Sequence, residues 1–165
     1  MKKLLLLSLL GAMGLTGANA ANLMDFSNMK PYVGAGYTYQ TQDDVNLHFL
    51  GLNGGVQLND FLGLEAFWNK FTNEPLKGEK LDVQYYGAGI TGQYPLVDQV
   101  YAKGLVGVSV MKADYGYDER TESGVIAQLG LGYNFNKNVA AEVSYTHQSP
   151  FSGVDGVNVQ VKYKF

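Results

Sequence analysis

The residues that could carry chemistry in this sequence are few, and the most suggestive are a His-x-Ser pair. His147 and Ser149 are followed by an acid, Asp155. A histidine can act as the base that activates a serine hydroxyl for attack on an acyl ester, and a carboxylate can orient that histidine. The alternative is a solvated loop without activity. The second histidine, His48, has no recognisable partner in the sequence.

Other chemistry has little support in the composition. The chain has no Cys and only 2 His among its 165 residues, so it lacks the clustered ligands of a metal site, and we expect no cofactor. It carries 12 basic and 15 acidic residues, a net charge of −3. Nucleic acid as a partner is disfavoured, because its binding requires basic patches.

The first 20 residues have the organisation of a secretory signal peptide. A basic start, Met1–Lys3, precedes an apolar stretch from Leu4 to Leu15 and an Ala18-Asn19-Ala20 cleavage signature. We predict cleavage after Ala20, a short lead segment over 21–30 and one domain over 31–165. Loss of Lys2 and Lys3 leaves ten basic against 15 acidic residues, a net charge of −5.

The remainder of the chain alternates apolar and polar residues with the period of two that is typical of β-strands. The alternating stretches are 31–40, 50–58, 62–69, 86–94, 100–110, 124–135, 139–146 and 156–165. Short turns and longer polar loops alternate between them, and no stretch has the period of an amphipathic helix. An even number of strands near ten residues long predicts an all-β, antiparallel, up-and-down transmembrane barrel of eight strands.

The two faces of these strands indicate which one meets lipid. One face is built from Val, Leu, Ala and Tyr, whereas the other is polar and rich in Gly. A soluble barrel, the alternative, would place the large apolar residues inside. Aromatic residues on the apolar face form two girdles, as at two membrane interfaces. They are Tyr94, Tyr133, Phe135, Tyr163 and Phe165 near the short turns, and Tyr37, Tyr39, Trp68, Tyr86 and Tyr145 towards the longer loops.

Four charged residues fall on the polar face at comparable depth near the short turns: Glu65, Lys103, Glu142 and Lys162. An unpaired charge in a narrow lumen is costly, so we expect Glu142 to pair with Lys162 and Glu65 with Lys103. Paired in this way, they would largely close the lumen. The alternative is a narrow ion-conducting pore.

The pattern resembles the eight-stranded outer-membrane β-barrel family of Gram-negative bacteria, the OmpA-like and OmpX-like transmembrane domains. The resemblance rests on the stretches Pro31–Tyr37, Leu62–Glu65, Val139–Tyr145 and Val159–Phe165. It implies that the closing strand, with Tyr163 and Phe165, is a signal read by the outer-membrane assembly machinery. The His147 and Ser149 pair with Asp155 separately resembles the lipid A deacylase barrels, although Pro150 replaces a polar residue of that family.

The segment from Lys112 to Ser123 is acidic and contains two Tyr, so it could contact partners at the cell surface. Acidic loops are more often simply solvated. We therefore predict a monomeric, non-enzymatic protein of the bacterial outer membrane with a structural or surface-interaction role. Its expected partners are membrane lipid, lipopolysaccharide and the assembly machinery. The alternatives are the narrow pore and the deacylase-like hydrolase.

Overall fold

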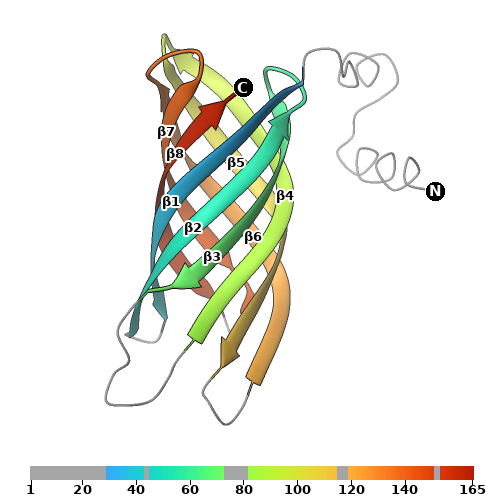
Figure 1. Cartoon of the computed structure of the whole chain (residues 1–165), viewed down its shortest axis with the longest axis vertical. Helices are drawn as coiled ribbons and strands as arrows, with labels where there is room; N and C mark the ends of the chain where they lie inside the picture. The colour runs from blue at the N-terminus through green and yellow to red at the C-terminus, as the bar shows by residue number, and fades with distance from the viewer. Residues whose placement is uncertain (1–28, 43–44, 73–81, 115–118, 151–152) are drawn as a thin grey trace, which may run out of the picture.

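The chain forms a closed antiparallel barrel in which every strand pairs with its neighbours in sequence and β1 pairs with β8 (Figure 1). The structure is a computed structural model that describes residues 29–42, 45–72, 82–114, 119–150 and 153–165. Its strands are β1 (Lys30–Gln42), β2 (Val45–Gln57), β3 (Leu62–Phe71), β4 (Asp82–Val97), β5 (Val100–Asp114), β6 (Glu119–Asn134), β7 (Val139–Gln148) and β8 (Val154–Lys164). The predicted fold is confirmed. The predicted signal peptide, and the lead segment up to residue 28, lie outside the described residues.

Alternation along each strand divides the barrel into an apolar outside and a filled inside. In β8 the burial pattern alternates strictly, with Val157, Val159 and Val161 half exposed on the outside while Asn158 and Gln160 are buried within. Successive strand residues point to opposite sides of a sheet, so a closed sheet sends every second residue into the lumen. The outer surface therefore consists of the Val, Leu and aromatic residues assigned to lipid from sequence.

The end of the barrel that holds the C-terminus also holds its short turns, and two of these turns are built alike (Figure 1). The side chain of Asn59 accepts hydrogen bonds from the backbone N–H groups of Phe61 and Leu62, each at 2.8 Å. Asn136 makes the same two bonds further along the chain. An Asn side chain that bonds the backbone two or three residues on stabilises a tight reversal. These turns fix the register of β3 and β7, the strands that carry Glu65 and Glu142.

At the opposite end, the strands extend further than the polarity of the sequence indicates. The segment from Lys112 to Ser123, predicted as a loop, belongs to β5 up to Asp114 and to β6 from Glu119, with 115–118 outside the described residues. The loop expected from His147 to Asp155 is likewise shortened, because both of these residues lie in strands. Polar residues can continue a backbone ladder beyond the apolar zone, and this explains the difference. None of the helices in the described part of the chain is long and apolar enough to span a membrane.

Candidate functional site

The four charged residues of the lumen meet in one buried cluster near the short-turn end. The Nζ of Lys103 lies 2.9 Å from an oxygen of Glu65 and 2.9 Å from one of Glu142. The Nζ of Lys162 lies 2.7 Å from the same Glu65 oxygen and 3.0 Å from the same Glu142 oxygen. All four side chains are at most 3 % exposed. Each lysine therefore bridges both carboxylates, and the two separate pairs expected from the sequence form a single network.

Two tyrosines that the sequence analysis did not assign to the cluster complete it. The hydroxyl of Tyr32 donates to Glu65 at 2.8 Å, and that of Tyr101 donates to Glu142 at 2.7 Å. The ammonium group of Lys162 also lies 4.4 Å from the ring centroid of Tyr32, which is a cation–π geometry. Each carboxylate thus lies within 3.0 Å of two ammonium groups and accepts a hydrogen bond from one phenol, and Glu142 also accepts one from the Gln160 amide. The buried charges are therefore well satisfied.

A glycine on the intervening strand lets each tyrosine reach its carboxylate. Tyr32 pairs with Gly55, and Gly55 pairs with Glu65 across β1, β2 and β3. Tyr101, Gly132 and the second glutamate repeat this order across β5, β6 and β7. A Cβ on Gly55 would lie 2.5 Å from the Tyr32 hydroxyl, and one on Gly132 would lie 2.1 Å from the Tyr101 ring. Each side chain therefore lies flat over a glycine, which any larger residue would obstruct.

The loop-side half of the lumen is filled differently, by a layer of packed apolar side chains. The ring of Tyr85 lies 5.1 Å from that of Phe49 and 6.1 Å from that of Phe67, measured between centroids. The Tyr85 hydroxyl donates to the Oγ1 of Thr38 on β1 at 3.4 Å, so this side chain extends from β4 across the lumen. The buried members of this layer are Leu47, Phe49, Phe67, Val83, Tyr85, Leu105, Met111, Ala113, Ile126 and Val154. The interior is thus polar and glycine-rich only in part.

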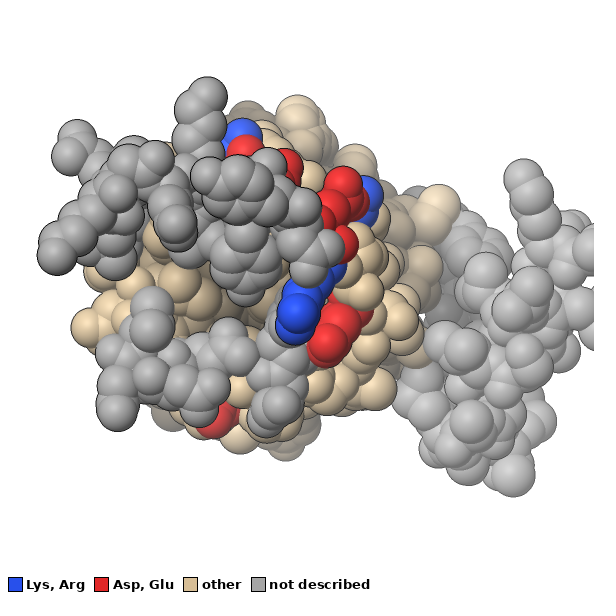
Figure 2. All heavy atoms as spheres, turned by 90° about the horizontal axis from the view of Figure 1, so that it is seen from below, with Lys and Arg blue, Asp and Glu red and all other residues tan. Residues whose placement is uncertain are grey.

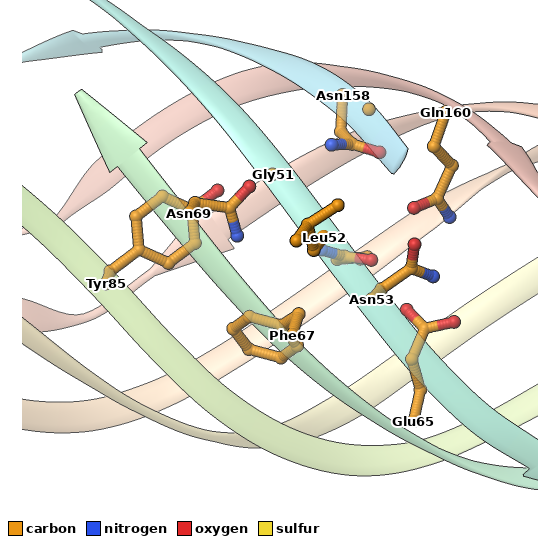
Figure 3. A pocket seen from close by; sticks show the side chains of 11 residues that line it. Gly51, Leu52, Asn53, Glu65, Phe67, Asn69, Tyr85, Asn158 and Gln160 are labelled. Carbon is orange, nitrogen blue, oxygen red and sulfur yellow. The ribbon is translucent and has the colours of Figure 1, made fainter. Parts of the chain in front are cut away.

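A small polar cavity lies between the charge cluster and the apolar layer (Figure 3). Glu65 contributes to its wall from the cluster, and Phe67 and Tyr85 contribute from the apolar layer. The remaining side chains around it are mostly carboxamides, those of Asn53, Asn69, Gln128, Asn158 and Gln160. Its volume is about 20 Å³, enough for at least one water molecule.

The candidate catalytic residues lie on the outer face at the loop end, away from the cluster. His147 and Asp155 face each other on β7 and β8, and the Nδ1 of His147 lies 2.7 Å from the Asp155 carboxylate. The hydroxyl of Ser149 accepts a hydrogen bond from the Val125 N–H at 2.8 Å. The structure thus brings the histidine and the acid together and holds the serine against β6. Among the described residues there is no group of three or more metal-ligating side chains.

The other histidine also has a partner, contrary to the sequence analysis. A nitrogen of His48 is hydrogen-bonded to the hydroxyl of Tyr37, and its ring packs edge-on against Tyr39 at 5.2 Å. These residues lie on adjacent strands, a proximity that cannot be identified without the register. All ten aromatic residues predicted for the girdles are exposed on the outer surface.

The rim at the loop end carries charges of both signs. Figure 2 shows Lys, Arg, Asp and Glu side chains next to one another on the part of this surface that the described residues form. Lys70 lies 3.2 Å from Asp82, and Lys112 lies 3.8 Å from Glu119. These exposed pairs contribute little to stability.

Comparison with known proteins supports the architecture. The family model for the outer membrane protein beta-barrel domain matches residues 5–165. Neisserial surface protein A is 14% identical, with a TM-score of 0.67 over 83% of this chain and 97% of that one. The attachment invasion locus protein Ail of Yersinia pestis is 18% identical, with a TM-score of 0.59 over 83% and 97%. The N-terminal β-barrel domain of Pseudomonas aeruginosa OprF is 14% identical, with a TM-score of 0.65 over 82% and 97%. The search of curated protein sequences found no match.

Proposed function

Because the chain belongs to the outer membrane protein β-barrel domain family, we propose that it serves as a small structural or surface component of the bacterial outer membrane whose lumen is closed to ions. The observation that carries this proposal is the buried cluster of Glu65, Lys103, Glu142 and Lys162, in which every charge is paired inside the barrel. An eight-stranded barrel leaves an interior that side chains can fill, and here they do so.

Conductance in planar bilayers tests the proposal against the alternative of a narrow pore. The purified wild-type protein should show no steady open state. A sustained and sizeable open level that scales with the amount of folded protein would establish the pore instead. Folding in the sample is verified by the shift in gel migration between boiled and unboiled protein.

The proposal extends to export, assembly and lipid contact. The N-terminal segment, cleaved after Ala20, would direct export, and the closing strand with Tyr163 and Phe165 would be read by the assembly machinery. The exposed outer aromatic residues, among them Trp68 and Tyr145, suit contact with lipid and lipopolysaccharide headgroups. We expect a monomer. Membrane fractionation should recover the protein with the outer membrane, and recovery in the soluble fraction would contradict this assignment.

The pairing of His147 with Asp155 favours one second candidate, an acyl-ester hydrolase acting on lipid at the outer leaflet. Asp155 would orient His147, which would take the proton of Ser149 as that hydroxyl attacks the ester carbonyl. The C–O bond to the alcohol would then break, with His147 returning the proton to the leaving alcohol, and water would hydrolyse the acyl-serine to release the fatty acid. Incubation of refolded protein with lipopolysaccharide tests this directly. Release of fatty acid that is lost in His147→Ala and kept in His48→Ala would establish the hydrolase, whereas no release would exclude it.

A further inference from the structure

The lumen is closed at two levels that differ in their chemistry, and a cavity lies between them. We propose that the charge cluster and the apolar layer are two independent barriers in series, with a hydrated chamber between them, so that the barrel stays sealed when either barrier is removed. This inference rests on the proposed closed barrel and adds that ion pairing alone does not account for the closure.

The first barrier resists ions because its own charges are fully paired. Glu65 already accepts hydrogen bonds from both lysines and from Tyr32. Glu142 accepts hydrogen bonds from Lys103, Tyr101 and Gln160 and forms an ion pair with Lys162 at 3.0 Å. A passing cation would have to displace an ammonium group from a carboxylate at 2.7–3.0 Å, and a passing anion would have to do the reverse. The net charge of the four groups is zero, so the cluster attracts neither kind of ion.

The second barrier resists ions because its packed apolar side chains are buried and carry no charge. The buried polar side chains of Thr38, Gln40 and Gln148 lie beside them on β1 and β7. Phe49 is 0 %, Leu105 1 % and Ile126 0 % exposed, and these residues come from three strands, β2, β5 and β6. Tyr85 adds its ring to the layer and reaches β1 through its hydroxyl. A hydrophobic constriction excludes ions by expelling water, and no charged group is needed for this effect.

The chamber separates the two barriers physically. Its wall includes Glu65 on one side and Phe67 and Tyr85 on the other, and Figure 3 shows carboxamide side chains between them. A cavity of about 20 Å³ with several polar groups suits an ordered water, whereas a dry cavity would be lined by apolar groups. Because different residues build the two barriers, one can be removed by substitution while the other is left intact.

Three sets of substitutions test the proposal by planar-bilayer conductance. The neutral set removes the cluster without leaving an unpaired charge, and the serine set makes the apolar layer wettable. A matched outward set alters the neighbouring, exposed residues on the same three strands as the serine set. The sets are Glu65→Gln with Lys103→Met, Glu142→Gln and Lys162→Met; Phe49→Ser with Leu105→Ser and Ile126→Ser; and Leu50→Ser with Val106→Ser and Val125→Ser.

The neutral, serine and outward sets should each keep the wild-type background, and the neutral and serine sets combined should raise the time-averaged conductance at least tenfold. Sustained conduction by either set alone at the level of the combination would overturn the proposal, because one barrier would then carry the whole seal. A silent combination would overturn it equally. Gel migration of boiled and unboiled samples reports folding, and Phe49→Ser alone replaces the serine set if the triple variant does not fold. Conduction by the wild type would instead refute the proposed closed barrel.

Discussion

Removal of one lysine from the charge cluster is the sharpest test of how the barrel is stabilised. In Lys103→Met the side chain keeps nearly the same length and remains apolar along its stem, but its ammonium group is lost. Glu65 and Glu142 then share the single cation of Lys162. One negative charge is left without compensation in a site that is at most 3 % exposed.

The expected cost follows from this imbalance. Breaking a buried ion pair by removing one partner costs about 3–5 kcal/mol, because the other charge stays buried without compensation. Lys70→Met is the matched control, since Lys70 and Asp82 form a pair with side chains that are 50% and 53% exposed. Loss of such a surface pair costs roughly 0–1 kcal/mol. Addition of Glu142→Gln to Lys103→Met restores neutrality and should recover a large part of the lost stability.

Urea titration in lipid vesicles measures these differences. Trp68 is the only Trp in the chain and lies on the outer surface, so its fluorescence reports the change from lipid to water on unfolding. The free energy of unfolding extrapolated to zero urea should fall by about 3–5 kcal/mol in Lys103→Met. A loss no larger than that of the Lys70 control, or no recovery in the double variant, would refute the reasoning.

Two further predictions follow from the packing of the lumen, and one from the proposed role of the closing strand. Gly132→Ala should lower the free energy of unfolding by roughly 1–3 kcal/mol in the same titration, because the new Cβ would lie 2.1 Å from the Tyr101 ring. Gly104→Ala is the control and should be nearly neutral, because its Cβ would have no neighbour nearer than 3.8 Å; equal effects of the two substitutions would contradict this. Tyr85→Phe should lower the free energy of unfolding by under about 1 kcal/mol, because the hydrogen bond that it removes is long. Tyr85→Ala removes the buried ring and should lower it by about 3–5 kcal/mol; a reversed order would count against the apolar layer. Deletion of Phe165 should lower the amount of folded protein in outer-membrane fractions more than any loop change, and unchanged levels would disprove its role in assembly.

Much of the fold could be predicted because successive residues of each strand face lipid and lumen in turn, and the two surroundings favour different residue types. In β8 the outward Val157, Val159 and Val161 and the inward Asn158 and Gln160 are separated by sequence parity alone. Neither the strand partners nor the exact register are needed for that assignment. The same parity assigned the four charged residues to the lumen.

The details of the lumen could not be predicted, since they depend on which residues of different strands meet. Tyr32 and Tyr101 contact the carboxylates across an intervening strand, and no local pattern marks such a contact. The apolar layer left a faint signal in Phe49, Leu105 and Ile126, which are large apolar residues at inward positions. Within one strand, each of these residues only interrupts the polar pattern of the inward positions. The closed sheet shows that together they form one layer.

The strand ends at the outer rim were misjudged for a different reason. A change from apolar to charged residues marks the point where the chain leaves lipid, not the point where backbone pairing stops. Asp114 still pairs with Glu119, and His147 still pairs with Asp155, in regular register. The hydrogen-bonded ladder therefore continues beyond the apolar band, and the candidate His–Asp contact depends on this continuation.

The glycines of the inner face indicate that this lumen is built to be filled. Glycine facing a lumen could signify open space, but here several glycines lie directly beneath a large side chain from an adjacent strand, at distances that leave no room for a Cβ. The pairs are Gly55 with Tyr32, Gly132 with Tyr101 and Gly87 with Phe67. Two of these pairs position the charge cluster and the third supports the apolar layer. The inner glycines thus permit the dense packing that both proposed barriers require, and an open pore would not need them at these positions.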